Sequence, residues 1–276
     1  RMLDLNKKVQ ESACSALSAL AEEAIEKLIP YLHKIIPVLL EALKKYQIRC
    51  LIVLYDTIGT LAEYIGPRDD TQEALLALVP TIMNKWQYLD TNQQQAFPLM
   101  ECITCLIGAL NTFFQPYALP IFKSCLELIE NTIYNRAVQQ ANGECFDPDF
   151  GICALDLLSA LAEGLGHGFD GLLGGSNLLN LLLECCKDRD AGLRQSSFAL
   201  IGDLSKTTMP RLMPALPAFI PHLVAGIDAE HPQACINALW ALSEISSHSQ
   251  AQIEQYAVEI INKLILLGEN PLIKKI

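Results

Sequence analysis

Apolar residues recur every three or four positions along most of this chain of 276 residues, with polar or charged residues between them. This spacing is typical of amphipathic helices. Strand-like alternation is not sustained anywhere, and the hairpin dipeptide Asn-Gly occurs only at Asn142-Gly143, inside a polar stretch. The pattern therefore predicts an all-α protein.

A group of segments shares small and aliphatic residues that lead to a Leu-Ala-like step, as in "ACSALSALAEE", "LYDTIGTLAEYIG" and "LDLLSALAEGLG". We align them on six anchor positions: Leu20, Leu61, Leu106, Leu161, Leu204 and Ile245. By subtraction, the anchors lie 41, 45, 55, 43 and 41 residues apart. Periods of about 40 to 47 residues are typical of HEAT and armadillo repeats, in which each helical hairpin buries its apolar face against its neighbours.

Between the anchors lie second amphipathic segments, many of which begin near proline, which is tolerated in a first helical turn. The polar stretch 137–150 explains the one long spacing as a loop insertion between helices. We therefore predict a HEAT-repeat α-solenoid, a right-handed superhelix of about six helical hairpins that forms a single array over 1–276. The chain begins with Arg1, and neither end reads as a polar capping repeat, so we expect a fragment of a longer solenoid.

Composition and charge narrow the classes of function. The formal net charge of −11 and the pI near 4.9 disfavour direct binding to nucleic acid, because an acidic surface repels phosphates. Proline or charge interrupts the apolar runs before the roughly 20 residues that span a bilayer, so no membrane segment is expected. The ten cysteines lie mostly in apolar helical patterns, which favours reduced thiols in a cytosolic or nuclear protein.

Candidate catalytic and metal motifs have simpler structural explanations. "GHGFDG" at 166–171 fits G-x-G-x-x-G, but a predicted helix precedes it where a dinucleotide site requires a strand, so we interpret it as a glycine-rich turn. Cys102 and Cys105 form a C-x-x-C without a second ligand pair, which favours buried thiols. The five histidines are scattered, and no nucleophile elbow or Walker loop occurs. We expect neither an enzyme nor a cofactor or metal site.

Reading the repeats in register reveals an excess of acids on one helix face. Positions five and one before each anchor, and two after it, are spaced four and three apart and so share a face. That face carries Glu22, Asp56, Glu63, Glu101, Asp156, Glu163, Asp203 and Glu244, with a single cation, Lys206. Trp240 falls on it as well, one turn after Asn237. Since equivalent helices of a solenoid line up, we predict a continuous acidic stripe on the inner wall.

Two interpretations of this face remain. The charges could form an ordinary solvated surface with Trp240 in the core, as single residues of these kinds usually do. Alternatively, the face binds a basic partner. Repulsion between the like charges costs a few tenths of a kcal/mol per close pair, and a basic partner would relieve it, while Trp240 would anchor an apolar side chain or an arginine stem. The one-signed set favours an extended, basic, partly apolar peptide as ligand.

Several blocks of the sequence resemble a known family. The blocks "LDLNKKVQESACSALSALAEEA", "FPLMECI", "LRQSSFALIGDLSK" and "CINALWALSEIS" are similar to middle and late HEAT repeats of the transportin (karyopherin-β2) family, nuclear import receptors of the importin-β superfamily. The resemblance implies a monomer that shuttles between cytoplasm and nucleus, contacts nucleoporins, carries cargo with a basic signal ending in proline-tyrosine, and releases it to GTP-bound Ran through repeats outside this chain.

The resemblance also assigns residues. It implies that the N-terminal part of the signal contacts a subsite of Trp240, Ile152, Asp156, Glu163, Gln195 and Asp203. It implies that Glu22, Asp56, Glu63 and Glu101 lead toward the proline-tyrosine site. Pro232 and Ala19 depart from the family's aliphatic residue and threonine, respectively. The alternative is a HEAT scaffold for folded partners, as in phosphatase regulatory subunits. Binding to such a scaffold through apolar contacts would depend less on salt than binding of a basic signal would.

Overall fold

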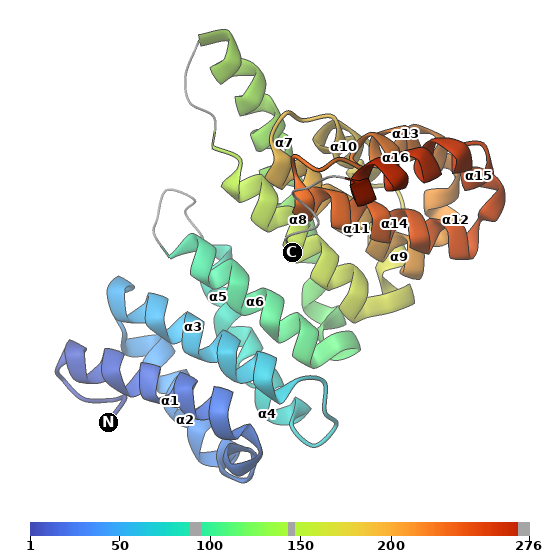
Figure 1. Cartoon of the computed structure of the whole chain (residues 1–276). Coiled ribbons are helices and arrows are strands. Elements are labelled where there is room, and N and C mark those ends of the chain that lie inside the picture. Colours follow the sequence, from blue (N-terminus) through green and yellow to red (C-terminus); the bar gives the residue numbers. More distant parts are fainter. Residues whose placement is uncertain (89–94, 143–146, 270–276) are drawn as a thin grey trace. The chain divides into compact units, whose positions relative to one another are not determined.

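The structure, a computed structural model, describes residues 1–88, 95–142 and 147–269. The chain divides into two compact units, Arg1–Leu119 and Pro120–Ile276. Every regular element among the described residues is an α-helix or a short 3-10 helix, which confirms the predicted all-α class (Figure 1).

The N-terminal unit is built from helices in two layers. Its elements are α1 Lys7–Leu28, η1 Ile29–Tyr31, α2 Leu32–Lys45, α3 Ile48–Ile65, α4 Gln72–Leu76, α5 Val79–Gln87, α6 Ala96–Leu110 and η2 Asn111–Phe114, followed by the start of α7 Gln115–Asn142. One layer consists of α1, α3 and α6 side by side, while α2 packs on α3, and α4 and α5 pack on α6. Leu54, Ile58 and Leu61 of α3 are fully buried, and each such side chain contributes about 1.5–3 kcal/mol to folding.

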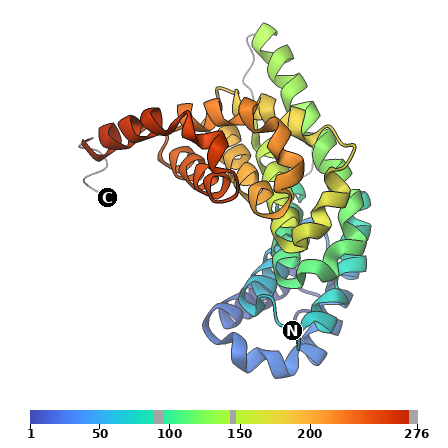
Figure 2. The ribbon, with the colours of Figure 1, turned by 90° about the vertical axis from the view of Figure 1, so that its right-hand side faces the viewer.

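The C-terminal unit repeats this arrangement. After α7 come α8 Asp149–Leu165, η3 Gly166–Phe169, α9 Asp170–Leu173, α10 Leu178–Cys186, α11 Ala191–Thr207, α12 Met209–Leu212, η4 Met213–Ala215, α13 Leu216–Ala225, α14 Pro232–His248, α15 Gln250–Glu254 and α16 Ala257–Glu269. Helix α11 lies between α8 and α14, with α10 packed on α11 and α13 on α14. Figure 2 shows α16, in red, at the edge of this unit.

The predicted register is wrong in the first repeat. Five of the six anchors are fully buried, but Leu20 is 51% exposed, whereas the adjacent Ala21 is fully buried. The string "SALAE" occurs in both α1 and α8, and matching its letters set the alignment one residue early. In α1 the buried face is Cys14, Ser18 and Ala21, with the Ser18 hydroxyl donating to Thr57 Oγ1 at 3.2 Å. Glu23, rather than Glu22, therefore occupies the position equivalent to Glu63.

The predicted loop at 137–150 is shorter in the structure at both ends. Helix α7 continues to Asn142 and α8 begins at Asp149, because the polar residues before Asn142 extend the amphipathic helix instead of ending it. Residues 143–146 of the predicted loop lie outside the described residues. The single array over residues 1–276 stays a prediction, because the chain divides into two compact units.

The glycine-rich stretch is a turn that follows a helix, as predicted. Helix α8 ends before Gly166, whose φ of 53° lies in the left-handed region that glycine adopts readily, and residues Gly166–Phe169 form η3. Prolines begin several helices, as predicted, and Pro37, Pro120 and Pro221 lie inside α2, α7 and α13.

Two helical stretches, Ala96–Gln139 and Asp149–Leu173, are long and apolar enough to cross a membrane by length and composition alone. Half of the relevant window in each is buried inside the protein, and core helices of soluble proteins pass the same test, so this is weak evidence for a membrane segment.

Candidate functional site

Three acids of the N-terminal unit act electrostatically on one thiol; we call Asp56, Glu63 and Glu101 the N-terminal acidic cluster. Asp56 and Glu63 extend from α3 and Glu101 from α6, and all three are exposed. Burial, together with the negative charges of Glu63, Glu101 and Asp56, raises the pKa of the Cys105 thiol to about 11. The charges of all three carboxylates therefore act on one thiol.

Helix α3 packs against α6 beside this cluster, at Gly59. A Cβ added to Gly59 would lie 3.5 Å from Cα of Cys102 and 3.6 Å from Sγ of Cys105, which is ordinary van der Waals contact. Among the described residues, no cation forms an ion pair with Asp56, Glu63 or Glu101. The cluster is thus an exposed surface of one charge sign. Glu22 is also exposed, on α1.

A second group of acids surrounds a tryptophan in the C-terminal unit. We call it the tryptophan cluster: Asp156 and Glu163 of α8, Asp203 and Lys206 of α11, and Trp240 and Glu244 of α14. Because α11 packs between α8 and α14, these side chains come together from three neighbouring helices. Every predicted site residue of this unit lies on one of those three helices.

Trp240 rests on the backbone of α11. A Cβ added to Gly202 would overlap the six-membered part of the indole ring, so the ring lies directly against the glycine. Trp240 is half-buried, whereas the other tryptophan, Trp86, is 4% exposed and belongs to the core. One turn before Trp240, Asn237 Nδ2 donates to the carbonyl oxygen of Gln195 at 3.0 Å and ties α14 to α11. Trp240 is therefore a seated, partly accessible aromatic surface.

Lys206 lies between an acid and the aromatic ring. Its Nζ is 3.9 Å from Oε1 of Glu163 and 5.8 Å from the centroid of the Trp240 ring. An ammonium within about 6 Å of an indole face is attracted by the ring quadrupole. The side chains of Lys206 and Glu163 are 41% and 71% exposed, so both remain accessible to water.

Two carboxylates of the tryptophan cluster are partly deprived of water. Asp203 is 8% exposed, and this burial raises the pKa of its carboxyl to about 6, with the Glu163 and Glu244 charges adding to the rise and Lys206 opposing it. The Ser159 hydroxyl near Asp203 lowers this pKa, although Ser159 Oγ has no partner at standard hydrogen-bond geometry among the described residues. Solvent reaches Asp156, but partial desolvation by the surrounding protein raises the pKa of its carboxyl. A hydrogen bond from Ser196 acts in the opposite direction and lowers this pKa.

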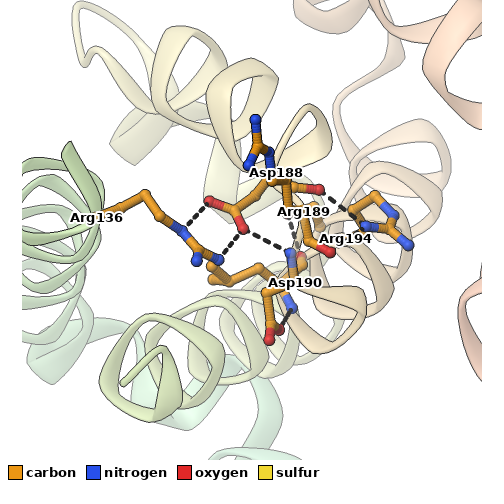
Figure 3. Close-up of polar contacts among 7 residues, drawn as sticks. Arg136, Asp188, Arg189, Asp190 and Arg194 are labelled. Carbon is orange, nitrogen blue, oxygen red and sulfur yellow. Dashed lines mark hydrogen bonds and ion pairs between the residues drawn. The ribbon is translucent and has the colours of Figure 1, made fainter. Parts of the chain in front are cut away.

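A polar network fixes the start of α11, on which this cluster depends (Figure 3). Arg136 of α7 pairs with Asp188, with its Nε donating to Oδ2 at 3.0 Å. Asp190 caps the helix by accepting from the Leu193 N–H at 3.0 Å, and Arg194 Nη1 donates to the carbonyl oxygens of Asp188 and Arg189, both at 2.9 Å. The network positions the first turn of α11 against α7.

Ile152 lies beside this first turn. A Cβ added to Gly192 would come 2.8 Å from Cδ1 of Ile152, so the isoleucine packs against the glycine backbone of α11. Ile152 and Gln195 are each partly exposed. Both side chains lie near the start of α11, whereas Lys206 lies near its end. The contacts of Ile152 with Gly192 and of Gln195 with Asn237 do not involve Lys206.

The sequence reasoning missed three features of this site. It counted Lys206 as a lone cation without predicting its contacts with Glu163 and Trp240. It also missed the seat at Gly202 and the serines beside the acids, Ser159 and Ser196. The signal available for the seat at Gly202 was a small residue in α11 facing a tryptophan of the next repeat. Among the described residues no group of three or more potential metal ligands occurs.

The fold defines the class of protein: an α-solenoid of helical repeats, an architecture shared with solved structures of importin β and of a designed armadillo repeat protein. The solved structure of importin β superimposes with a TM-score of 0.70, covering 98% of this chain and 32% of that one, at 16% identity. No protein-family model matches the chain.

Sequence comparison identifies the particular relatives. The chain is 39% identical to transportin-1 of Homo sapiens over 274 residues, which is 98% of this chain, and 36% identical to transportin of Dictyostelium discoideum over 270 residues. It spans 30% of the length of the human protein and 29% of the other. Over nearly its whole length the chain is thus similar in sequence to one part of the transportins.

Proposed function

We propose that this chain supplies part of the cargo surface of a nuclear import receptor. Its ligand is the basic, extended segment of a localisation signal that ends in proline-tyrosine. In this proposal Trp240 anchors an apolar side chain or an arginine stem, while the acids of both clusters attract the basic residues. Asn237, Gln195 and Ile152 line the same subsite. The receptor shuttles between cytoplasm and nucleus, contacts nucleoporins, and releases its cargo to GTP-bound Ran.

One observation carries the proposal: the tryptophan cluster holds four carboxylates, one lysine and a half-buried indole on three adjacent helices. The pKa of Asp203 is raised mainly because the carboxyl is buried, so its negative charge is poorly solvated in the free protein. Cationic ligand groups would compensate it, and the indole face would bind either a guanidinium or an aliphatic chain. An extended basic peptide satisfies both requirements.

The first test is calorimetric titration of the 276-residue chain with a synthetic basic peptide that ends in proline-tyrosine. We expect binding that weakens steeply as salt rises, because exposed charges are screened beyond about 10 Å at 0.1 M salt. Trp240→Ala should weaken it about tenfold or more, as for other aromatic anchors. Tyr134→Ala on α7, which removes an aromatic ring that is 68% exposed, is the control and should leave affinity unchanged.

Charge reversal separates a site from general attraction. Asp156→Lys with Glu163→Lys should abolish binding of the basic segment. The matched control, Glu230→Lys with Glu254→Lys, makes the same change in net charge at two exposed positions outside the cluster. Equal losses in the two variants would overturn the proposal. Binding that ignores salt and survives both reversals would instead support a scaffold for folded partners.

A further inference from the structure

Lys206 occupies the place that a cationic ligand group would need in the tryptophan cluster. Its Nζ pairs with Glu163 at 3.9 Å and lies 5.8 Å from the Trp240 ring centroid, so it uses the carboxylate and the aromatic face together. Resting on the function proposed above, we propose that Lys206 is an internal competitor: it holds the cation position in the free protein and must be displaced by a ligand, which selects for arginine-rich ligands over isolated lysines.

The contacts of Lys206 are suited to displacement. Both partners of the ion pair are well exposed, at 41% and 71%, and the distance of 3.9 Å is at the long end for such a pair. Exposed pairs of this kind contribute little stability, so a ligand can exchange for the lysine at small cost. The same contacts nevertheless exist in the free protein, and a ligand must replace them before it gains from them.

The chemistry of the exchange determines which ligand benefits. A single ligand lysine exchanges one ammonium for another at Glu163 and gains almost nothing there. An arginine gains, because its planar guanidinium pairs with a carboxylate through two parallel hydrogen bonds and stacks on an indole ring. A ligand with several cations gains again, since Asp156, Asp203 and Glu244 are held by no ion pair among the described residues.

The experiment measures the affinity of two otherwise identical basic peptides, one with arginines and one with lysines, for the 276-residue chain and its Lys206 variants. Lys206→Met keeps the aliphatic stem and removes the charge. This variant should bind the lysine peptide about three- to fivefold more tightly than the wild type does. The gain for the arginine peptide should be smaller, so the ratio of the two affinities moves closer to one. Lys206→Arg, a stronger internal competitor, should weaken binding of both peptides.

The matched control is Lys187→Met. Lys187 belongs to the same unit, is 42% exposed, and pairs with Glu184 at 2.7 Å outside the tryptophan cluster, so its removal changes the net charge equally. We expect an affinity change below about 1.5-fold, because a distant exposed charge is screened. In a Glu163→Gln background the gain from Lys206→Met should shrink, since the lysine then has no carboxylate to hold it there.

The outcomes separate this inference from the proposed function. If the wild-type chain binds neither peptide, the proposed function fails and the competitor role fails with it. If both peptides bind but Lys206→Met weakens binding, or matches Lys187→Met, the competitor role alone is overturned and Lys206 is a ligand contact or a bystander. Circular dichroism melting of each variant checks that the fold is intact.

Discussion

The two acidic clusters are built on the same helix positions but differ in what surrounds them. In the N-terminal cluster, the charges of exposed carboxylates act on a thiol, and no ion pair among the described residues neutralises them. In the tryptophan cluster, the acids enclose a half-buried indole and a lysine, and one acid, Asp203, is nearly removed from water. Exposed charges mainly raise association rates and specificity, whereas a desolvated aromatic centre slows dissociation. The comparison predicts attraction by the first cluster and anchoring by the second.

The two glycines beneath these clusters offer the largest test of the comparison. Gly202→Ala places a Cβ inside the Trp240 ring, so the ring must move, and we expect a net loss of about 1–2 kcal/mol in unfolding free energy from overpacking. Gly59→Ala meets only ordinary contacts and should stabilise its unit by up to about 1 kcal/mol through helix propensity. Urea denaturation followed by circular dichroism measures both. Equal effects would mean that Trp240 is not seated on Gly202.

Protonation of Asp203 gives a pH-dependent effect on stability. Its folded pKa of about 6 is raised from 3.8, so between these values the folded state binds a proton that the unfolded state lacks. The linkage makes the protein more stable as pH falls from 7 toward 4, by about 2 kcal/mol. Asp203→Asn should be more stable than wild type at pH 7 and lose this dependence.

Stability measured by denaturation at several pH values tests this, with Glu254→Gln, an exposed acid, as the control that should follow wild type. Affinity for the basic peptide should also fall as pH drops through 6, because the cluster then loses a negative charge. A wild-type stability curve that runs parallel to that of Asp203→Asn between pH 4 and 7 would contradict the assignment.

The smallest effect concerns Cys105. Because burial and three neighbouring acids raise the pKa of its thiol to about 11, little thiolate is present at pH 8 and alkylation should be slow. Glu63→Gln should speed alkylation of Cys105 a few-fold, with Glu101→Gln and Asp56→Asn similar or weaker. Peptide-resolved mass spectrometry of iodoacetamide labelling measures the rate at this cysteine alone. Rates unaffected by all three changes would show that the acids do not converge there.

The sequence alone predicted the helical class and the shared face of the repeats, because both follow from the spacing of apolar positions within single segments. It failed at Leu20, where identical letters in α1 and α8 concealed a one-residue shift that only burial reveals. It also could not predict how deeply Trp240 and Asp203 are buried. Those depths depend on Gly202 and Ser159, which lie on neighbouring helices, and spacing along one helix carries no information about them.

Trp240 has an optical consequence. The chain has two tryptophans: Trp86 is sealed in the core of the N-terminal unit and emits from a constant environment, while Trp240 borders solvent beneath an ammonium group. Any event that removes Lys206 from the indole, or covers the ring, alters the emission of Trp240 and leaves that of Trp86 as an internal reference. The protein thus carries an unlabelled fluorescent reporter of occupancy at the residue on which its proposed binding surface depends.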